Sequence, residues 1–317
     1  MAHWLVTGGA GFIGSHIAHT LVSMGEKVRV LDNFYSGKKE FLDGIEDKIE
    51  LIKGDIRDHD TVLKAVKGID YVLHQAAMRS VPLSIEQPSE CNAVNVNGTL
   101  QLLIASAQTK VKRFVFASSS SIYGDTDKFP QSETDTPNPI SPYAVSKLAG
   151  EYYIRMFSQT YGLSGVSLRY FNVFGPKQDP KSKYANVIPK FILEALQGKS
   201  LEVHWDGEQS RDFTYIETVV QANILAAQSS KEVKSIYNVG CGESTSLLQI
   251  IESLEKIIGK KLQKEFYPKR NGDVRKTYSS IQALKKDFNY TPKVNFEQGL
   301  NATYRYFAEK DRWREYI

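Results

Sequence analysis

Cysteine is scarce in this sequence, and a long apolar run is missing. The two cysteines, Cys91 and Cys241, are far apart and lack metal-ligand spacing, which argues against a disulfide framework and against a cysteine-bound metal. No apolar stretch reaches membrane-spanning length, and the N-terminus enters a strand at once, with no signal peptide. We therefore predict a reduced, cytoplasmic protein with no membrane partner and no metal.

A strong excess of charge of either sign is also missing. The net charge is +4 over 317 residues, and no long basic run occurs, which predicts that nucleic acid is not a partner. Hydrophobic residues at 41% and charged residues at 24% are ordinary for a globular protein. The length suits one large domain or two smaller ones.

Short apolar strands alternate with helical stretches through the first half of the chain. The expected strands cover residues 4–6, 28–31, 49–52, 71–73, 114–117 and 164–168, and helices between them cover 60–67 and 89–108. This rhythm is typical of an α/β fold, here a Rossmann-like doubly wound parallel sheet with helices on both faces. Right-handed crossovers then bring the ends of the first, fourth and fifth strands together at a ligand crevice.

A glycine-rich loop follows the first strand directly. It reads as Gly9-x-Gly11-x-x-Gly14 and, in an offset register, as Gly8-x-x-Gly11-x-x-Gly14. Glycines at this spacing allow a tight strand-to-helix turn and let a pyrophosphate approach the backbone, where the helix N-terminus supplies unpaired N–H groups. A glycine-rich turn without a ligand is the competing interpretation.

Asp32 disfavours that competing interpretation. It stands at the end of the second strand, about 20 residues after the loop, where a carboxylate accepts hydrogen bonds from adenosine ribose hydroxyls. It would also repel a 2′-phosphate, so NAD is favoured over NADP. Asp55, followed by Ile56 after the third strand, either edges the adenine or is a plain helix N-cap, a role open equally to Asp58.

After about Tyr170 the alternation breaks. Pro176, Pro180 and Pro189 mark an irregular stretch. Beyond it we expect a smaller mixed α/β C-terminal substrate lobe, with a short strand at 201–204, helices near 217–229, 246–258 and 295–308, and a return of 236–239 to the main sheet. The predicted domains are a NAD-binding Rossmann domain at 1–175 plus about 213–240, and a substrate lobe at about 176–212 and 241–317.

Tyr143 and Lys147 form a Tyr-x-x-x-Lys pair some two dozen residues after Ser119. With 17 tyrosines and 40 basic residues, such a pair arises about twice by chance, so its weight comes from its place after the glycine loop and the serine. A tyrosine base near pH 7 needs its pKa of about 10 lowered by about three units, and a lysine one helical turn away favours the phenolate. An ordinary amphipathic helix and a solvated serine turn are the alternative.

In order along the chain, these motifs resemble the extended short-chain dehydrogenase/reductases, and within them the nucleotide-sugar 4-epimerases. Further motifs that carry the resemblance are Gly54-Asp55-Ile56-Arg57, His74-Gln75-Ala76-Ala77, Asn95-Val96-Asn97-Gly98-Thr99, Ser118–Gly124, Leu168–Gly175, Ser210-Arg211-Asp212-Phe213 and Gly272-Asp273-Val274-Arg275. The resemblance covers essentially the whole chain.

The resemblance implies two sets of binding residues. NAD is expected at Gly8, Gly11, Phe12, Ile13, Gly14, Asp32, Asn33, Asp55, Ile56, Gln75, Ala76, Ala77, Arg79, Asn95, Lys147 and Tyr170. A UDP-sugar is expected at Ser119, Ser120, Tyr143, Asn172, Gln178, Asn186, Val187, Arg211, Arg270, Asp273 and Thr277, with the two arginines clamping the pyrophosphate. A homodimer through helices at 89–108 and 143–160 is also expected.

The same resemblance implies the reaction. Tyr143, with Lys147 and Ser119, removes the proton of the sugar 4-hydroxyl while hydride passes from C4 to NAD. The 4-keto sugar then turns over and receives the hydride on its other face. From other classes, a non-catalytic NAD-binding module and a NAD-consuming oxidoreductase remain alternatives, the first disfavoured because the catalytic residues are all present.

Six positions bear on the sugar. Family dehydratases carry an Asp-Glu pair where this chain has Ser120 and Ser121, so dehydration is not expected. Asp179 would repel a uronate carboxylate, and the small Thr277 would admit an N-acetyl group. Residues 169–180 also resemble the N-acetylhexosamine subgroup of the family most. Asn186, together with Arg79, looks more like the galactose type. We expect interconversion of UDP-GlcNAc and UDP-GalNAc, with UDP-glucose and UDP-galactose as further substrates; a strict UDP-glucose 4-epimerase or a UDP-glucuronate 4-epimerase is the alternative.

Overall fold

A computed structural model describes residues 1–181, 186–229, 234–269 and 274–316. Its central sheet has the strand order β11-β6-β5-β4-β1-β2-β3, and all neighbouring strands run parallel. The strands are β1 (His3–Thr7), β2 (Lys27–Asp32), β3 (Ile49–Lys53), β4 (Tyr71–His74), β5 (Arg113–Ser119), β6 (Gly165–Tyr170) and β11 (Ile236–Val239). The expected adjacency of the first, fourth and fifth strands is confirmed, as is the return of 236–239 to the sheet.

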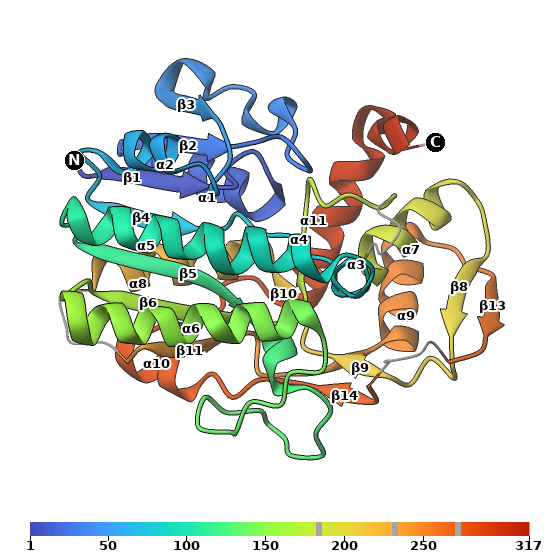
Figure 1. The fold of residues 1–317 in the computed structure, drawn as a ribbon. Helices are drawn as coiled ribbons and strands as arrows, with labels where there is room; N and C mark the ends of the chain where they lie inside the picture. The colour runs from blue at the N-terminus through green and yellow to red at the C-terminus, as the bar shows by residue number, and fades with distance from the viewer. Residues whose placement is uncertain (182–185, 230–233, 270–273, 317) are drawn as a thin grey trace.

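Helices cover both faces of this sheet, with α5 and α6 in front of it and α8 behind it in Figure 1. Because successive side chains of a strand point to opposite faces, β1 sends Trp4 and Val6 to one core and Leu5 to the other. The first core packs against α1 (Phe12–Ser23), α8 (Ile216–Gln228) and α10 (Gln282–Phe288), and the second against α2 (His59–Val66), α5 (Thr99–Gln108) and α6 (Pro142–Tyr161). The predicted doubly wound α/β fold is confirmed.

The helix expected over residues 89–108 is not uniform. It consists of α4 (Pro88–Asn92), a π-helical turn (Ala93–Gly98) and α5, and it follows the short α3 (Val81–Glu86). The turn accommodates Asn95, whose side chain is buried against neighbouring segments, and Gly98, whose Cβ would approach Ile56 Cδ1 to 2.6 Å. Such turns are frequent at functional sites, and this one packs directly under the predicted adenine-edge residue Ile56.

The C-terminal lobe has its own apolar core, between α7 (Val187–Leu196), α9 (Leu247–Ile258) and α11 (Phe296–Ala308), to the right of the sheet in Figure 1. Small sheets surround it: β8 (Leu201–His204) with β13 (Lys264–Tyr267), β9 (Ser210–Arg211) between β12 (Thr245–Ser246) and β14 (Lys276–Thr277), and β7 (Val173–Phe174) with β10 (Thr214–Tyr215). Short 3-10 helices are η1 (Lys39–Leu42), η2 (Glu46–Lys48), η4 (Ser120–Tyr123) and η5 (Glu309–Tyr316). The mixed lobe agrees with the sequence prediction.

Neither a membrane-spanning helix nor a metal-binding cluster is present in the described part of the chain. In residues 1–181, 186–229, 234–269 and 274–316, no helix is both long enough and apolar enough to cross a membrane. The same residues contain no group of three or more His, Cys, Asp or Glu side chains placed to hold a metal ion.

Candidate active site

The carboxyl ends of β1, β2, β4 and β5 open into one cavity, called here the cofactor cavity. Of the predicted residues, it is lined by Gly8, Gly11, Phe12, Ile13, Gly14, Asp32, Asn33, Asp55, Ile56, Gln75, Ala76, Ala77, Arg79, Tyr143, Lys147 and Tyr170. Residues spread over more than 160 positions of sequence therefore meet at one edge of the sheet, the edge where doubly wound folds bind ligands.

The glycine turn of this cavity has no room for side chains. A Cβ on Gly14 would lie 2.1 Å from the carbonyl oxygen of Gly8, and Gly8 itself has a left-handed backbone with φ +65°. The N-cap of α1, Gly11, offers no side-chain hydrogen bond to the first amides of the helix. These amides and the positive end of the helix are suited to phosphate oxygens.

Asp32 is held at the end of β2 by two backbone amides. Its Oδ2 accepts from Ala10 N at 2.9 Å and its Oδ1 from Phe34 N at 2.8 Å. Burial raises the pKa of this carboxyl group, an effect that the two amides oppose. Each oxygen keeps a further lone pair, so the carboxylate can still accept hydrogen bonds from ribose hydroxyls.

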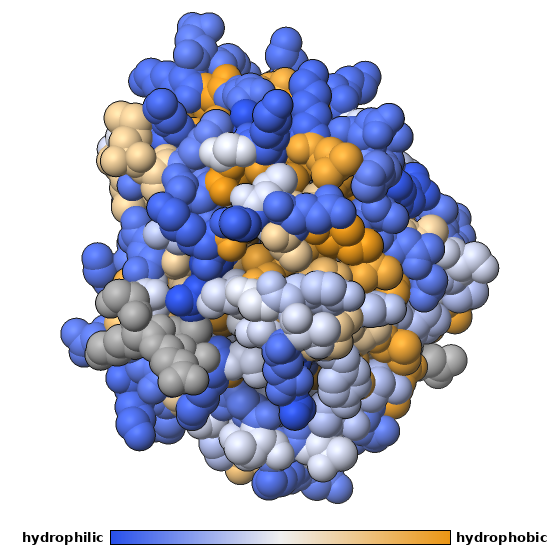
Figure 2. All heavy atoms as spheres, turned by 60° about the vertical axis from the view of Figure 1, so that its left-hand side comes forward, coloured by the Kyte–Doolittle hydropathy of each residue, from blue (hydrophilic) through white to orange (hydrophobic). Residues whose placement is uncertain are grey.

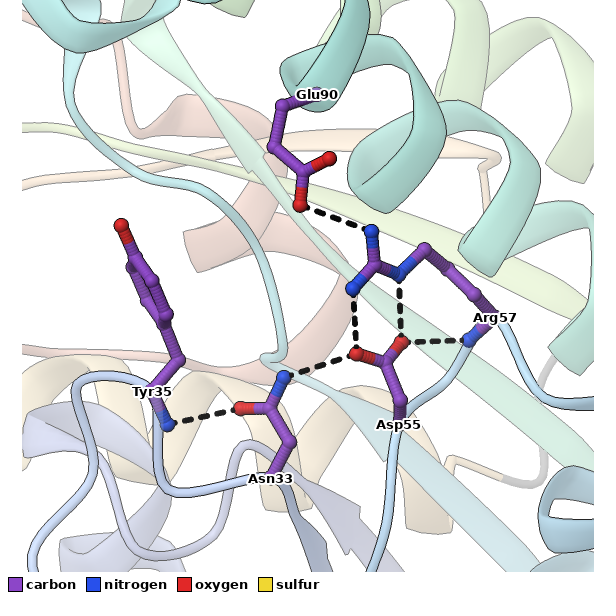
Figure 3. Close-up of polar contacts among 5 residues, drawn as sticks. All are labelled: Asn33, Tyr35, Asp55, Arg57 and Glu90. Atoms are coloured by element: carbon purple, nitrogen blue, oxygen red, sulfur yellow. Dashed lines mark hydrogen bonds and ion pairs between the residues drawn. The ribbon is translucent and has the colours of Figure 1, made fainter.

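Asp55 belongs to a polar network on the cavity wall (Figure 3). Arg57 donates from Nε to Oδ1 and from Nη2 to Oδ2 of Asp55, at 2.9 and 2.8 Å, and this pairing lowers the pKa of Asp55 to about 2. Asn33 adds a bond at 3.0 Å, and Glu90 binds Arg57 at 2.8 Å. The cap of α2 is Asp58, which accepts from Thr61 N. Of the two interpretations of Asp55, the N-cap is therefore wrong.

Asn95 lies behind the cavity wall and is not among the lining residues. Its side chain accepts from Met78 N at 2.8 Å and donates to Met78 O at 3.1 Å and to Ser146 Oγ at 3.0 Å. These bonds join the loop after β4 to α6, the helix of Tyr143 and Lys147. In this structure Asn95 positions the wall rather than forming it.

Tyr143 and Lys147 lie on the first two turns of α6, which Ser141 caps. The Lys147 ammonium donates to the carbonyl of Ala117, at the end of β5, and lies 5.8 Å from the centre of the Tyr143 ring. Burial lowers the pKa of Lys147 to about 8. Ser119, also at the end of β5, hydrogen-bonds Tyr143. The structure thus brings the three predicted catalytic residues together.

The pKa of Tyr143 differs from the sequence expectation in direction. Burial raises it, and the hydrogen bond with Ser119 only partly opposes that effect. The positive charge of an oxidised nicotinamide beside the ring would lower it. The expected lowering of the Tyr143 pKa therefore depends on a bound cofactor.

A second cavity lies in the C-terminal lobe and adjoins β7 and β9. Asn172, Asn186, Val187 and Arg211 of the predicted substrate set line it. The other predicted residues lie elsewhere: Ser120 is half-buried in η4, Gln178 is buried with its amide on Val173 O, and Thr277 pairs with Arg211 across β14 and β9. Arg270 and Asp273 lie outside the described residues.

Sequence reasoning missed several lining residues. The cofactor cavity is also lined by Tyr35, Ser36, Gly37, Lys38, Phe41, Arg57, Glu90 and Lys177, and the second cavity by Lys190, Glu202, His204 and Gln209. Asp179, which the sequence analysis placed near the sugar, lines the cofactor cavity. The residues from Tyr35 to Phe41 had a usable signal, because they follow Asp32 at the same edge of the sheet. Nothing in the sequence pattern places Glu90 beside Arg57.

The chain is similar to known nucleotide-sugar enzymes. Residues 4–240 match the model of the NAD dependent epimerase/dehydratase family. The structure is similar, with a TM-score of 0.93 and 39% identity, to a UDP-N-acetylglucosamine 4-epimerase of Methanobrevibacter ruminantium M1 in complex with UDP-N-acetylmuramic acid, over 98% of this chain and 99% of that one. A UDP-glucose 4-epimerase of Thermotoga maritima with UDP-glucose gives 0.92 and 38%, over 97% and 99%. A UDP-N-acetyl-alpha-D-glucosaminuronate decarboxylase of Bacillus cytotoxicus is 36% identical over 96% of this chain and 97% of its own length.

Proposed function

The chain belongs to the NAD dependent epimerase/dehydratase family, and we propose that it interconverts UDP-GlcNAc and UDP-GalNAc, with UDP-glucose and UDP-galactose as further substrates. The observation that carries the 4-epimerase proposal is the meeting of Tyr143 and Lys147 on the wall of the cofactor cavity, with Ser119 beside Tyr143 although Ser119 is not itself a lining residue. A second cavity with Arg211 and two asparagines lies in the adjoining lobe, where a nucleotide diphosphate would be bound.

Tyr143 acts as the base in this proposal. Its phenolate takes the proton of the sugar 4-hydroxyl and later returns it. Ser119 hydrogen-bonds the reacting oxygen, and the Lys147 cation stabilises the phenolate. NAD, which the residues lining the cofactor cavity would hold, would supply the acceptor and then the donor of the hydride at C4.

Three side chains support epimerisation of a neutral hexose over reaction of a uronic acid or a dehydration. Asp179 lines the cofactor cavity, where its carboxylate would repel the carboxylate of a uronic acid. Ser120 and Ser121 follow Ser119 and lack the acid and base that elimination of water requires. The small Thr277 beside Arg211 is the basis for including N-acetylated sugars.

A substrate comparison tests the proposal. The purified protein is given UDP-GlcNAc, UDP-glucose and UDP-glucuronate separately, without added NAD, and the products are identified. We expect UDP-GalNAc and UDP-galactose. A product from UDP-glucuronate alone would favour the uronate alternative, a 4-keto product with reduced cofactor would favour an oxidoreductase, and no product from any of the three would favour a non-catalytic NAD-binding module.

We further propose a homodimer built on α5 and α6. Figure 2 shows apolar side chains gathered on one face of the molecule. On α6, Val145 and Tyr152 are 52% and 59% exposed, and Leu148 and Met156 are partly buried. Leu103 and Phe157, on the same two helices, belong to the core and are not available. Light scattering at micromolar concentration would give a dimer mass, and a monomer mass would contradict this.

A further inference from the structure

Two segments far apart in the sequence complete one wall of the cofactor cavity. The first is the β2 loop, defined as residues 33–42, which contributes Tyr35 and Phe41 among its lining residues. The second is the β7 segment, defined as residues 175–181, which contributes Lys177 and Asp179. The two segments meet at Lys177.

The Lys177 ammonium joins the two segments directly. Its Nζ donates to the carbonyl of Phe41 at 2.7 Å and lies 5.8 Å from the centre of the Phe41 ring. The same nitrogen lies 3.2 Å from His19 Nε2, on α1. Lys177 itself adopts a left-handed backbone with φ +68°, which is uncommon for a residue with a side chain. One ammonium group thus connects the β7 segment, the β2 loop and α1.

Helix α1 supports both partners of this contact. His16 Nε2 hydrogen-bonds the carbonyl of Pro176 at 2.9 Å, and His19 Nε2 lies 2.9 Å from the carbonyl of Phe41. Both histidines lie on one side of the helix, three residues apart. Since burial lowers the pKa of His16 to about 4, this ring is neutral at pH 7 and donates through Nε2. The same helix begins at the glycine turn, so the contact is fixed relative to the expected phosphate site.

The rest of the β2 loop has a small set of long-range contacts. Asn33 donates to Asp55 at 3.0 Å, and Phe34 and Leu42 pack against the first core. Lys38 N donates to Ala10 O at 2.9 Å, and the Lys38 ammonium lies 5.0 Å from the centre of the Tyr316 ring. Phe34 and Tyr35 are bonded only locally by their amides, to Asp32 and Asn33. A cofactor bound in this cavity would contact both the β2 loop and the β7 segment, because both line it.

We propose that Lys177 is a positioning residue that fastens the β2 loop to the β7 segment and so retains NAD between turnovers. The contact is a charge-assisted hydrogen bond to a backbone carbonyl, the stronger kind of hydrogen bond in proteins. Removing it raises the rate of NAD dissociation by roughly 10- to 100-fold, the loss expected for one such bond. The inference rests on the family's cofactor and does not depend on which sugar the enzyme accepts.

The first measurement is the exchange of NAD. The protein is loaded with radiolabelled NAD, mixed with excess unlabelled NAD, and sampled over time. Lys177→Met should lose label roughly 10- to 100-fold faster than the wild type, and Lys177→Arg, which keeps a cationic donor, should restore most of the retention. Lys112→Met is the matched control. Lys112 immediately precedes β5, and its side chain is 67% exposed, so this variant should keep the wild-type rate of NAD exchange. Exchange at the wild-type rate in Lys177→Met overturns the proposal.

A second measurement distinguishes two ways in which Lys177 could retain NAD: by fastening the β2 loop to the β7 segment, called here the clasp, or by contacting NAD directly. Hydrogen–deuterium exchange of the NAD-free proteins reports the opening of the β2 loop by itself. The clasp predicts faster exchange of the amides of residues 34–42 in Lys177→Met, whereas direct contact alone predicts no change, a result that also overturns the proposal. Should Lys177→Met not fold, Lys177→Gln, which is shorter and uncharged, serves the same two comparisons. Loss of 4-epimerase activity has no part in either readout.

Discussion

Arg169 and Glu151 form a bidentate ion pair inside the protein, with their side chains 2% and 1% exposed. The pair joins β6 to α6, and Glu151 also accepts the hydroxyl hydrogen of Ser118, the neighbour of Ser119. Arg169 also donates a hydrogen bond to the Tyr123 hydroxyl, and this hydroxyl donates to Asn238 of β11. A buried polar network therefore links three strands of the sheet and includes Ser118, the neighbour of Ser119.

Breaking this ion pair is expected to destabilise the fold. Glu151→Gln leaves the Arg169 charge buried without its counter-ion, which costs about 3–5 kcal/mol in the free energy of unfolding. Glu252→Gln is the control, because it breaks an exposed pair with Lys256 on α9 and should cost less than about 1 kcal/mol. Urea unfolding followed by circular dichroism measures both, and equal costs would show that the buried pair does not support the site.

Tyr143→Phe tests the proton carrier. The ring and its packing remain, so the fold and NAD content should be kept, while kcat falls by about 10²- to 10⁴-fold. Tyr161→Phe removes a hydroxyl from the same helix at a position 61% exposed and should leave kcat unchanged. Near-normal turnover in Tyr143→Phe would remove the assigned base.

The buried His16 is expected to make stability sensitive to acid. Its pKa is about 4 in the folded protein and 6.5 as an unperturbed group, mainly because of burial. Between these values only the unfolded chain takes up the proton, so the free energy of unfolding falls as the pH drops through this window. The slope from one such group is about 1.4 kcal/mol per pH unit. His16→Gln, whose amide can still donate to Pro176 O, should have a slope smaller by that amount in urea titrations from pH 6 to 4.5. If the free energy of unfolding falls with pH equally in the wild type and in His16→Gln, the acid sensitivity does not come from His16.

Thr277→Tyr tests the choice of sugar. If Thr277 lines the wall beside the 2-substituent, overpacking should cost 1–3 kcal/mol and lower selectivity for the acetylated pair about 5- to 150-fold, while UDP-glucose turnover survives. Thr245→Tyr is a matched control, because Thr245 pairs with Arg211 from the opposite strand of the same small sheet. Equal losses on both sugar pairs in Thr277→Tyr would show that this position does not select the sugar.

Much of the site followed from short-range sequence signals. The glycine turn, Asp32 and the Tyr143–Lys147 pair each occupy a place that a strand end or a helical turn fixes, and all line the predicted cavity. The parallel sheet followed from the alternation of short strands and helices along the chain, which is also a short-range signal.

Long-range partners were not predictable in this way. The interruption of the helix at 89–108 comes from Asn95, which bonds Met78 and Ser146, residues that no local pattern connects to it. The pairing of Arg169 with Glu151 and of Lys177 with Phe41 O likewise depends on how distant segments fold together. The expected lowering of the Tyr143 pKa is also not found, because burial raises this pKa more than Ser119 and Arg79 lower it.

The fate of a label on the sugar tests the central claim most directly. UDP-GlcNAc carrying deuterium at C4 is incubated with the purified protein, with no NAD added, and the UDP-GalNAc formed is analysed for deuterium. A 4-epimerase that passes hydride to its bound NAD and takes it back should yield product with the deuterium still at C4, because a hydride held on the cofactor does not exchange with water. Product that has lost the deuterium, or no product with either the acetylated or the unacetylated sugar, would contradict the account.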